Sequence, residues 1–254
     1  MKKIIFADEF DFADIKNAGF DGIFIKPQNK EHALKTKELC DKHSLIFSSL
    51  HGPSIICNLM YTDNPEPYIE QQIGLIDLAH ELGVKFVITH ATLHIDTPTY
   101  NPLAVERYKK LFDYAYSKGV TLCIENLEHE HIVFLLNELY GYKGGGFCLD
   151  TGHNNAYTPQ LDFERFTPVY LHLNDNFGMT GKTYDGIDDL HLIPYDGNAD
   201  FERILLNLKR QGYDGELTFE LKKHNSDLYK NLSDKEFLEK AYSVACDIEN
   251  KIKG

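Results

Sequence analysis

The segment GGGFCLDTGHNNAY (residues 144–157) shows how one strand of this chain ends. The stretch 146–150 is short and mostly apolar, which predicts a buried strand. That strand finishes on Asp150, and His153 follows three residues later. The glycines precede the strand rather than follow it, so they predict a turn and not a phosphate-binding loop. An acid and a histidine at the end of a buried strand indicate that this strand opens on a polar cavity.

Seven further apolar segments of strand length are spread along the chain, at residues 3–7, 22–27, 45–51, 84–90, 120–126, 169–175 and 216–221. Amphipathic segments separate them, such as 67–83 and 102–119, the second of which stops at Gly119, a common helix terminator. Alternating strands and helices predict parallel strands. Eight such units predict an α/β fold consisting of a single (β/α)8 TIM barrel, with the functional site at the C-terminal ends of the strands. No linker or shift in composition divides the chain, so residues 1–254 are expected to form one domain.

Composition limits the partners and the setting of the protein. The 254 residues carry 39 acidic against 26 basic side chains, and the formal net charge of −13 disfavours nucleic acid as a partner. No apolar run reaches the roughly 18 to 20 residues of a membrane helix, and the first residues do not resemble a secretory signal. The five cysteines are scattered and odd in number, which favours a reducing, cytoplasmic setting. A small-molecule substrate is therefore expected, and the sequence leaves homo-oligomerisation open.

Metal-binding side chains close most of the predicted strands. Six of the eight strand ends carry a histidine or an acid, namely His51, His90, Glu125, Asp150, His172 and Glu220. Three further such residues, Asp188, Asp189 and His191, lie in the loop after the seventh strand. Each of these alone is explained by a hydrogen bond at the barrel rim or by a helix cap. Together they predict a site for divalent ions such as zinc or manganese, because imidazoles and carboxylates are the ligands of these ions.

Several longer motifs agree with this layout and carry a family resemblance. They are HGPSIICNL (51–59), VITH (87–90), IEN (124–126), CLDTGH (148–153), LHLND (171–175), DLHLIPYDG (189–197) with DF at 200–201, and Glu220. Through them the chain resembles the xylose-isomerase-like barrel superfamily, from about residue 45 to residue 221. That superfamily holds sugar-phosphate isomerases and epimerases as well as the endonuclease IV family.

The resemblance implies roles for nine positions, all of which carry the matching residue types here. In the isomerases and epimerases, one divalent metal is held by four residues, which correspond to Glu125, Asp150, His172 and Glu220. In the endonuclease branch, Glu125 would bridge to a second metal held by His51 and His90, and a third metal would be held by His153, Asp189 and His191.

Three positions depart from the family patterns. Ser54 and Leu190 stand where the endonuclease pattern has a tyrosine and an arginine, so they favour the isomerase branch. Tyr195 replaces the usual glycine of the D-x-H-L-x-P-G motif of isomerase-like members, which leaves the geometry of that loop and a substrate contact open.

The resemblance implies a divalent-metal-dependent sugar isomerase or epimerase that acts on a small hydroxylated carbonyl compound by proton transfer. Glu125 and Glu220 are the expected catalytic pair, and His153 is expected to contact a substrate hydroxyl. Lys26 and Lys222 are assigned by position alone to a substrate carboxylate or phosphate. The scarcity of arginine near strand ends favours a free sugar or related hydroxy-ketone.

Two other reactions stay open. An endonuclease IV-like multinuclear zinc phosphoesterase would use the full set of nine ligands, and a dehydratase of a small cyclic acid would use the same metal and base. A barrel that has lost its catalytic activity would be expected to have lost a metal ligand, and all nine positions carry the matching residue types.

Overall fold

The computed structural model of the protein describes residues 1–93, 99–181 and 187–254. Within these residues eight parallel strands form one sheet in the order β7-β6-β5-β4-β3-β2-β1-β8. The strands are β1 (Lys3–Phe6), β2 (Gly22–Ile25), β3 (Ile46–His51), β4 (Phe86–His90), β5 (Thr121–Glu125), β6 (Gly145–Asp150), β7 (Tyr170–His172) and β8 (Leu217–Phe219). A bridge between Leu173 and Phe219 joins the two edges. The predicted (β/α)8 barrel is therefore confirmed.

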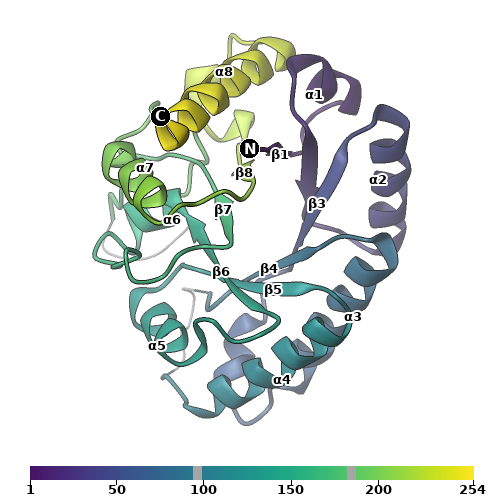
Figure 1. Ribbon diagram of the computed structural model, residues 1–254, viewed down its shortest axis with the longest axis vertical. Coiled ribbons are helices and arrows are strands. Elements are labelled where there is room, and N and C mark those ends of the chain that lie inside the picture. Colours follow the sequence, from purple (N-terminus) through teal and green to yellow (C-terminus); the bar gives the residue numbers. More distant parts are fainter. Residues whose placement is uncertain (94–98, 182–186) are drawn as a thin grey trace.

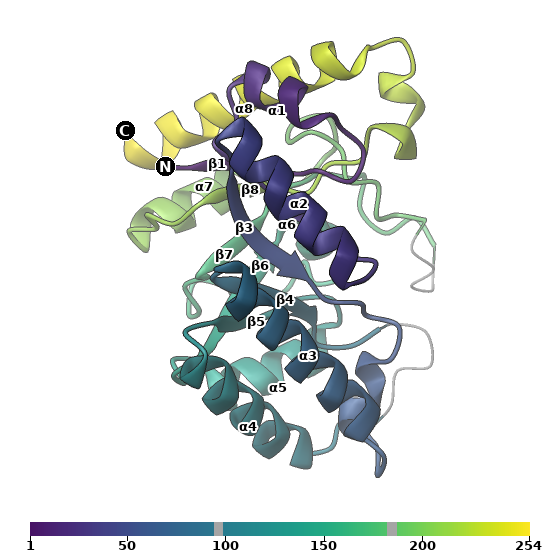
Figure 2. The ribbon, with the colours of Figure 1, turned by 90° about the vertical axis from the view of Figure 1, so that its right-hand side faces the viewer.

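Helices surround the strands as an outer ring, as Figure 1 shows looking down the molecule and Figure 2 shows from the side. They are α1 (Phe12–Ala18), α2 (Lys30–His43), α3 (Glu66–Leu82), α4 (Leu103–Ser117), α5 (His129–Leu139), α6 (Thr151–Ala156), α7 (Phe201–Arg210) and α8 (Asp234–Lys253). Short 3-10 turns lie at Cys57–Tyr61, Lys223–Asn225 and Asp227–Tyr229. Helices α3 and α4 match the two amphipathic segments predicted from the sequence to within two residues. No helix among the described residues is long and apolar enough to cross a membrane.

Alternate side chains along each strand point to opposite faces of the sheet, and this alternation divides the core. Ile5, Ile23 and Ile25 belong to the large cluster packed against the helices. Two smaller clusters fill the barrel itself, one of Ile4, Phe6 and Phe24 and one of Ile88, Cys123, Cys148 and Tyr170. The interior is thus a packed core and not a pore.

The glycines at 144–146 form both the turn before β6 and the start of that strand. Gly144 forms the turn with a φ of 76°, as the sequence predicted. Gly145 and Gly146 already belong to the strand, which begins one residue earlier than expected. A Cβ on Gly145 would lie 2.3 Å from the Phe112 ring of α4, so close packing of α4 requires the missing side chain.

Candidate metal centre

The parallel strands bring the predicted ligands to one end of the barrel. Strands β3 to β7 end on His51, His90, Glu125, Asp150 and His172, and Glu220 directly follows β8. The strand register sets His90 beside Glu125 and Asp150 beside His172. All of these residues are buried except His90, which is half-buried.

Glu125 lies at the centre of this group, and its carboxylate is fully buried. Its Oε1 is 2.8 Å from Nδ1 of His172. Its Oε2 is 3.1 Å from Nε2 of His51 and also 3.1 Å from Nε2 of His90. Three imidazoles from three different strands therefore converge on one carboxylate.

Two overlapping sets of donor atoms are close enough to hold an ion. The first donor group consists of His51, Glu125, His172 and Glu220, whose ligand atoms lie within 4.8 Å of one another. Within it, Nδ1 of His172 is 3.0 Å from Oε2 of Glu220. The second donor group consists of His90, Glu125 and His153 and shares the carboxylate of Glu125.

Backbone carbonyls orient three of the imidazoles. Nδ1 of His51 donates to the carbonyl of Gly52 over 2.8 Å, and Nδ1 of His153 donates to that of Asn126 over 2.9 Å. Nδ1 of His191 donates to the carbonyl of Glu220 over 3.1 Å. Since a carbonyl only accepts, the proton sits on Nδ1 in each ring and Nε2 faces the site. Histidines that bind metals are oriented in this way.

Asp150 is held at the edge of the first donor group. Its Oδ1 accepts from the backbone N–H of His153 over 2.6 Å and so caps α6. Its Oδ2 accepts from Nδ2 of Asn174 over 2.8 Å and lies 4.0 Å from Nδ1 of His172. The resemblance predicted Asp150 as a ligand; the first donor group contains His51 and does not include Asp150.

Asp189 and His191 form a pair beside these groups, and Nε2 of His191 is 2.9 Å from Oδ2 of Asp189. The same Oδ2 lies 3.6 Å from Nε2 of His153. Oδ1 of Asp189 is buried and has no hydrogen-bond partner among the described residues. Asp188, by contrast, accepts hydrogen bonds from the hydroxyl and backbone N–H of Thr180, so it holds its own loop.

The buried acids at this site are offset in part by protonated histidines, although burial lowers the pKa of His90 to about 4 and leaves that ring neutral. Burial raises the pKa of Asp150 to about 6. Burial acts in the same direction on Glu125, but its interaction with His172, together with hydrogen bonds from His172 and His51, outweighs burial and holds the pKa of Glu125 well below its usual range. Burial opposes the charged form of His172, yet its acidic neighbours raise its pKa well above the usual value. A bound divalent cation can replace these protons, because metal binding releases protons from its ligands. The donor set therefore fits a metal.

A cavity of about 190 Å³ opens above the donor groups. Its walls contain eight of the predicted site residues, which are Lys26, His51, His90, His153, Asp189, His191, Glu220 and Lys222, together with Ser54. Leu93, Leu127 and Tyr157 complete the lining and were missed, since nothing in their sequence context distinguishes them from core residues. Glu125, Asp150 and His172 do not line the cavity.

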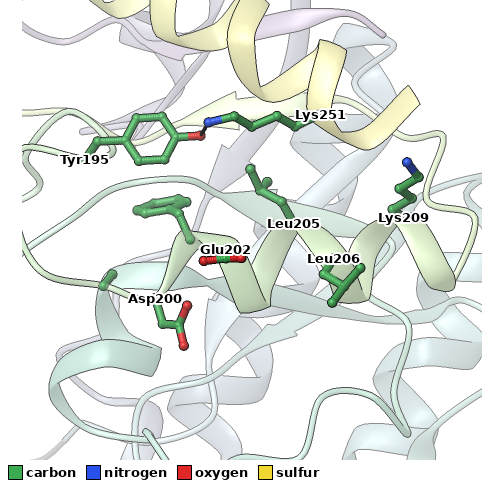
Figure 3. Close-up of a pocket in the computed structure, with 9 residues that line it drawn as sticks. Tyr195, Asp200, Glu202, Leu205, Leu206, Lys209 and Lys251 are labelled. Atoms are coloured by element: carbon green, nitrogen blue, oxygen red, sulfur yellow. Dashed lines mark hydrogen bonds between the residues drawn. The ribbon is translucent and has the colours of Figure 1, made fainter. Parts of the chain in front are cut away.

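A larger cavity of about 630 Å³ lies elsewhere, on the outer surface beside α7 and α8 (Figure 3). Tyr195 lines this outer groove, and its hydroxyl is 3.2 Å from Nζ of Lys251. None of the predicted metal ligands lines it. The groove is therefore separate from the metal centre.

The position of Tyr195 explains why the family pattern has glycine there. Its φ is 76°, in the left-handed region that glycine adopts without strain. Its backbone N–H and that of Gly197 both donate to Oδ2 of Asp175 over 3.0 Å, and these bonds hold the loop in place. The side chain points to the outer groove and not to the metal centre, so the loop keeps its geometry without a substrate contact from Tyr195.

Comparison with known proteins agrees with this fold. A family model described as a xylose isomerase-like TIM barrel matches residues 12–241. The chain therefore belongs to the xylose isomerase-like TIM barrel family.

Known structures and relatives extend the comparison. A D-psicose 3-epimerase from Clostridium cellulolyticum H10 matches with a TM-score of 0.77 and 16% identity, over 99% of both chains. A D-allulose 3-epimerase from Methylomonas sp. matches with a TM-score of 0.72 and 19% identity, over 97% of this chain and 98% of that one. At these identities the likeness is one of fold. An uncharacterized protein, y4fM of Sinorhizobium fredii, is 26% identical over 194 residues, which are 70% of this chain and 58% of the relative's length.

Proposed function

We propose that the protein is a divalent-metal-dependent isomerase or epimerase of a small hydroxylated carbonyl compound. The observation that carries this proposal is the buried first donor group of His51, Glu125, His172 and Glu220 beneath a small polar cavity. The shared fold with D-psicose and D-allulose 3-epimerases supports it.

The metal would be held by His51, Glu125, His172 and Glu220, with Asp150 beside them. Mixed carboxylate and imidazole donors suit zinc or manganese. When bound, such an ion polarises a substrate carbonyl and makes the neighbouring C–H more acidic.

Glu220 is the carboxylate best exposed to a substrate, because it lines the cavity whereas Glu125 lies below it. His172 engages Oε2 of Glu220, so we assign the proton transfer to Oε1. Glu125 comes from β5, on another side of the barrel, and is the second base that an epimerisation would require. His153 and His191 lie in the cavity wall, where they would bind substrate hydroxyls.

Hydrogen exchange tests this proposal. Metal-loaded protein is incubated in D2O with a panel of ketoses, and deuterium on the carbon next to the carbonyl is followed by mass spectrometry. Glu220→Gln keeps the size of the side chain but removes the base, so the exchange rate is expected to fall by about 10²- to 10⁴-fold. Glu202→Gln in the outer groove is the matched control and should leave the rate unchanged. Undiminished exchange by Glu220→Gln would refute the assignment.

A multinuclear phosphoesterase is the second candidate. The second donor group shares Glu125 with the first, and the pair of Asp189 and His191 offers further ligands. Ser54 and Leu190 stand against it, as does the net charge of −13. Cleavage of an oligonucleotide with an abasic site, dependent on His90 and His191, would establish this alternative. Loss of water from a small cyclic acid, added to the protein in a parallel incubation, would instead identify a dehydratase.

A further inference from the structure

We propose that Lys26 and Lys222 form a carboxylate-binding subsite in the cavity, so that the substrate is a small keto acid bearing hydroxyl groups rather than a neutral ketose. This inference rests on the proposed function, because it names the substrate class of the same site. It starts from the position of the two lysines in the cavity wall.

The two lysines enter the cavity from one side. Lys26 directly follows β2 and Lys222 follows β8, and both strands are neighbours of β1. His90 and Leu127 line the cavity from the ends of β4 and β5, which lie further round the barrel. The cavity is therefore polarised, with its ammonium groups gathered at one end.

The backbone holds both lysines in position. The N–H of Lys222 donates to the carbonyl of His191 over 3.1 Å, and its own carbonyl accepts from the N–H of Asn225 over 3.3 Å. The N–H of Lys26 donates to the carboxylate of Asp8. Each side chain therefore starts from a fixed point on the rim of the barrel.

Among the described residues the two lysines are not held in ion pairs, although the carboxylate of Asp8 interacts with the charge of Lys26 from a longer distance. In the part of the chain that the structure describes, neither ammonium group has a carboxylate within ion-pair distance, whereas the adjacent Lys223 pairs with Asp234 over 2.6 Å. Lys222 lines the same cavity as Glu220, which precedes it by two residues, and its backbone is bonded to His191.

A carboxylate fits this end of the cavity better than a phosphate. The described residues of the lining include no arginine, the side chain that binds phosphate oxygens in pairs. The N-terminus of α6, another anion-binding element, is already occupied by the side chain of Asp150. A carboxylate is also smaller than a phosphate group, which suits a cavity of about 190 Å³, and the metal centre beside the lysines would take the carbonyl and hydroxyl oxygens of the same molecule.

Binding of three matched compounds tests the subsite. Calorimetry on metal-loaded protein compares a neutral ketohexose, the hexulosonic acid of the same carbon skeleton and a ketohexose phosphate. The acid is expected to bind most tightly. Lys26→Gln and Lys222→Gln should each weaken its binding by about 10- to 100-fold, since a hydrogen bond to a charged group is lost. Lys209→Gln, which removes an exposed ammonium in the outer groove, is the matched control and should have no effect.

Three results would overturn the inference. In the first, the neutral sugar binds most tightly and neither glutamine substitution changes its affinity. In the second, the phosphate binds most tightly and its binding depends on the lysines. In the third, none of the three compounds binds. Lys26→Arg and Lys222→Arg keep the positive charge. If the acid still binds to these variants but not to the glutamine variants, the loss is an effect of charge and not of misfolding. Deuterium exchange on the same samples separates the two proposals. If all variants exchange deuterium into a neutral ketose, the proposed function stands and the subsite is refuted. If the acid binds in a lysine-dependent way but no compound exchanges deuterium, the subsite stands and the proposed function is refuted.

Discussion

At the scale of single residues, Glu125 is the carboxylate on which the histidines of β3, β4 and β7 converge. His51 and His90 are equidistant from its Oε2, at 3.1 Å each, yet only His51 also belongs to the first donor group. These two histidines therefore form a natural pair for testing where the ion binds.

We predict that His51→Gln lowers the affinity for the metal by more than about tenfold, which corresponds to about 1.4 kcal/mol. His90→Gln should retain affinity within a few-fold, because His90 lies outside the first donor group. Titration against a competing chelator measures both values. Equal losses in the two variants would mean that the ion binds between the two groups or that both are occupied.

The candidate metal ligands could be identified from the sequence, but the residues that support them could not. Acids and histidines at the ends of apolar strands are conspicuous in a sequence. Asn174 carries no such signal, and its bond to Asp150 arises only because the segment after β7 passes beside the end of β6. Asn126 accepts from the N–H of Asp150 over 2.8 Å, and its place in the IEN segment does not reveal this bond.

At the scale of elements, the junction of β6 and α6 links the strand end to the site. Asp150 ends the strand and caps the helix, and Asn174 holds its other oxygen. Gly152 lies in the first turn of α6, where an added Cβ would come within 1.9 Å of Oδ1 of Asn174. The close approach of these two elements requires glycine.

Gly152→Ala is expected to lower the free energy of unfolding by about 1–3 kcal/mol, because the added methyl group overpacks the junction. Gly74→Ala is the matched control, since Gly74 lies in α3 with nothing within 4 Å of the added Cβ. It should raise the free energy of unfolding by about 0.5–1 kcal/mol. Urea denaturation measures both. A Gly152→Ala protein as stable as the unsubstituted protein would show that Asn174 can move without cost.

Element boundaries were predicted less well than the elements themselves. The apolar run 169–175 predicted a seven-residue strand, but β7 ends at His172. Leu173 forms a single bridge to Phe219, and Asp175 turns towards the loop that it holds. Hydrophobicity predicts which residues are buried, but not which of them pair with a neighbouring strand. Residues 173–175 are buried although β7 has already ended.

At the scale of the whole molecule, the barrel gathers ligands that lie up to 169 positions apart in the sequence, from His51 to Glu220. Eight repeated strand and helix segments made the barrel predictable, and the barrel in turn predicts that all strand ends meet at one rim. The size of the cavity and the depth of Glu125 below it depend on side-chain packing, which no segment of the sequence reveals by itself.

Metal removal is expected to destabilise the whole barrel, because the site joins most of its strands. A ligand at 100 to 1,000 times its Kd stabilises the native state by about 3–4 kcal/mol. For a chain of this size, chelation should therefore lower Tm by roughly 5–15 °C. Calorimetry before chelation, after it and after metal is restored measures the change. An unchanged Tm would mean that the protein was purified without a bound ion or that none binds.

The most direct test of the central claim is the number and identity of bound ions per chain, measured by mass spectrometry on protein purified without chelators or a histidine tag. The proposed function predicts one zinc or manganese ion per chain, retained in His90→Gln and lost in His51→Gln. Two or three zinc ions per chain, lost together when His51 or His191 is replaced, would contradict it and favour phosphoester hydrolysis. No bound ion would contradict both mechanisms.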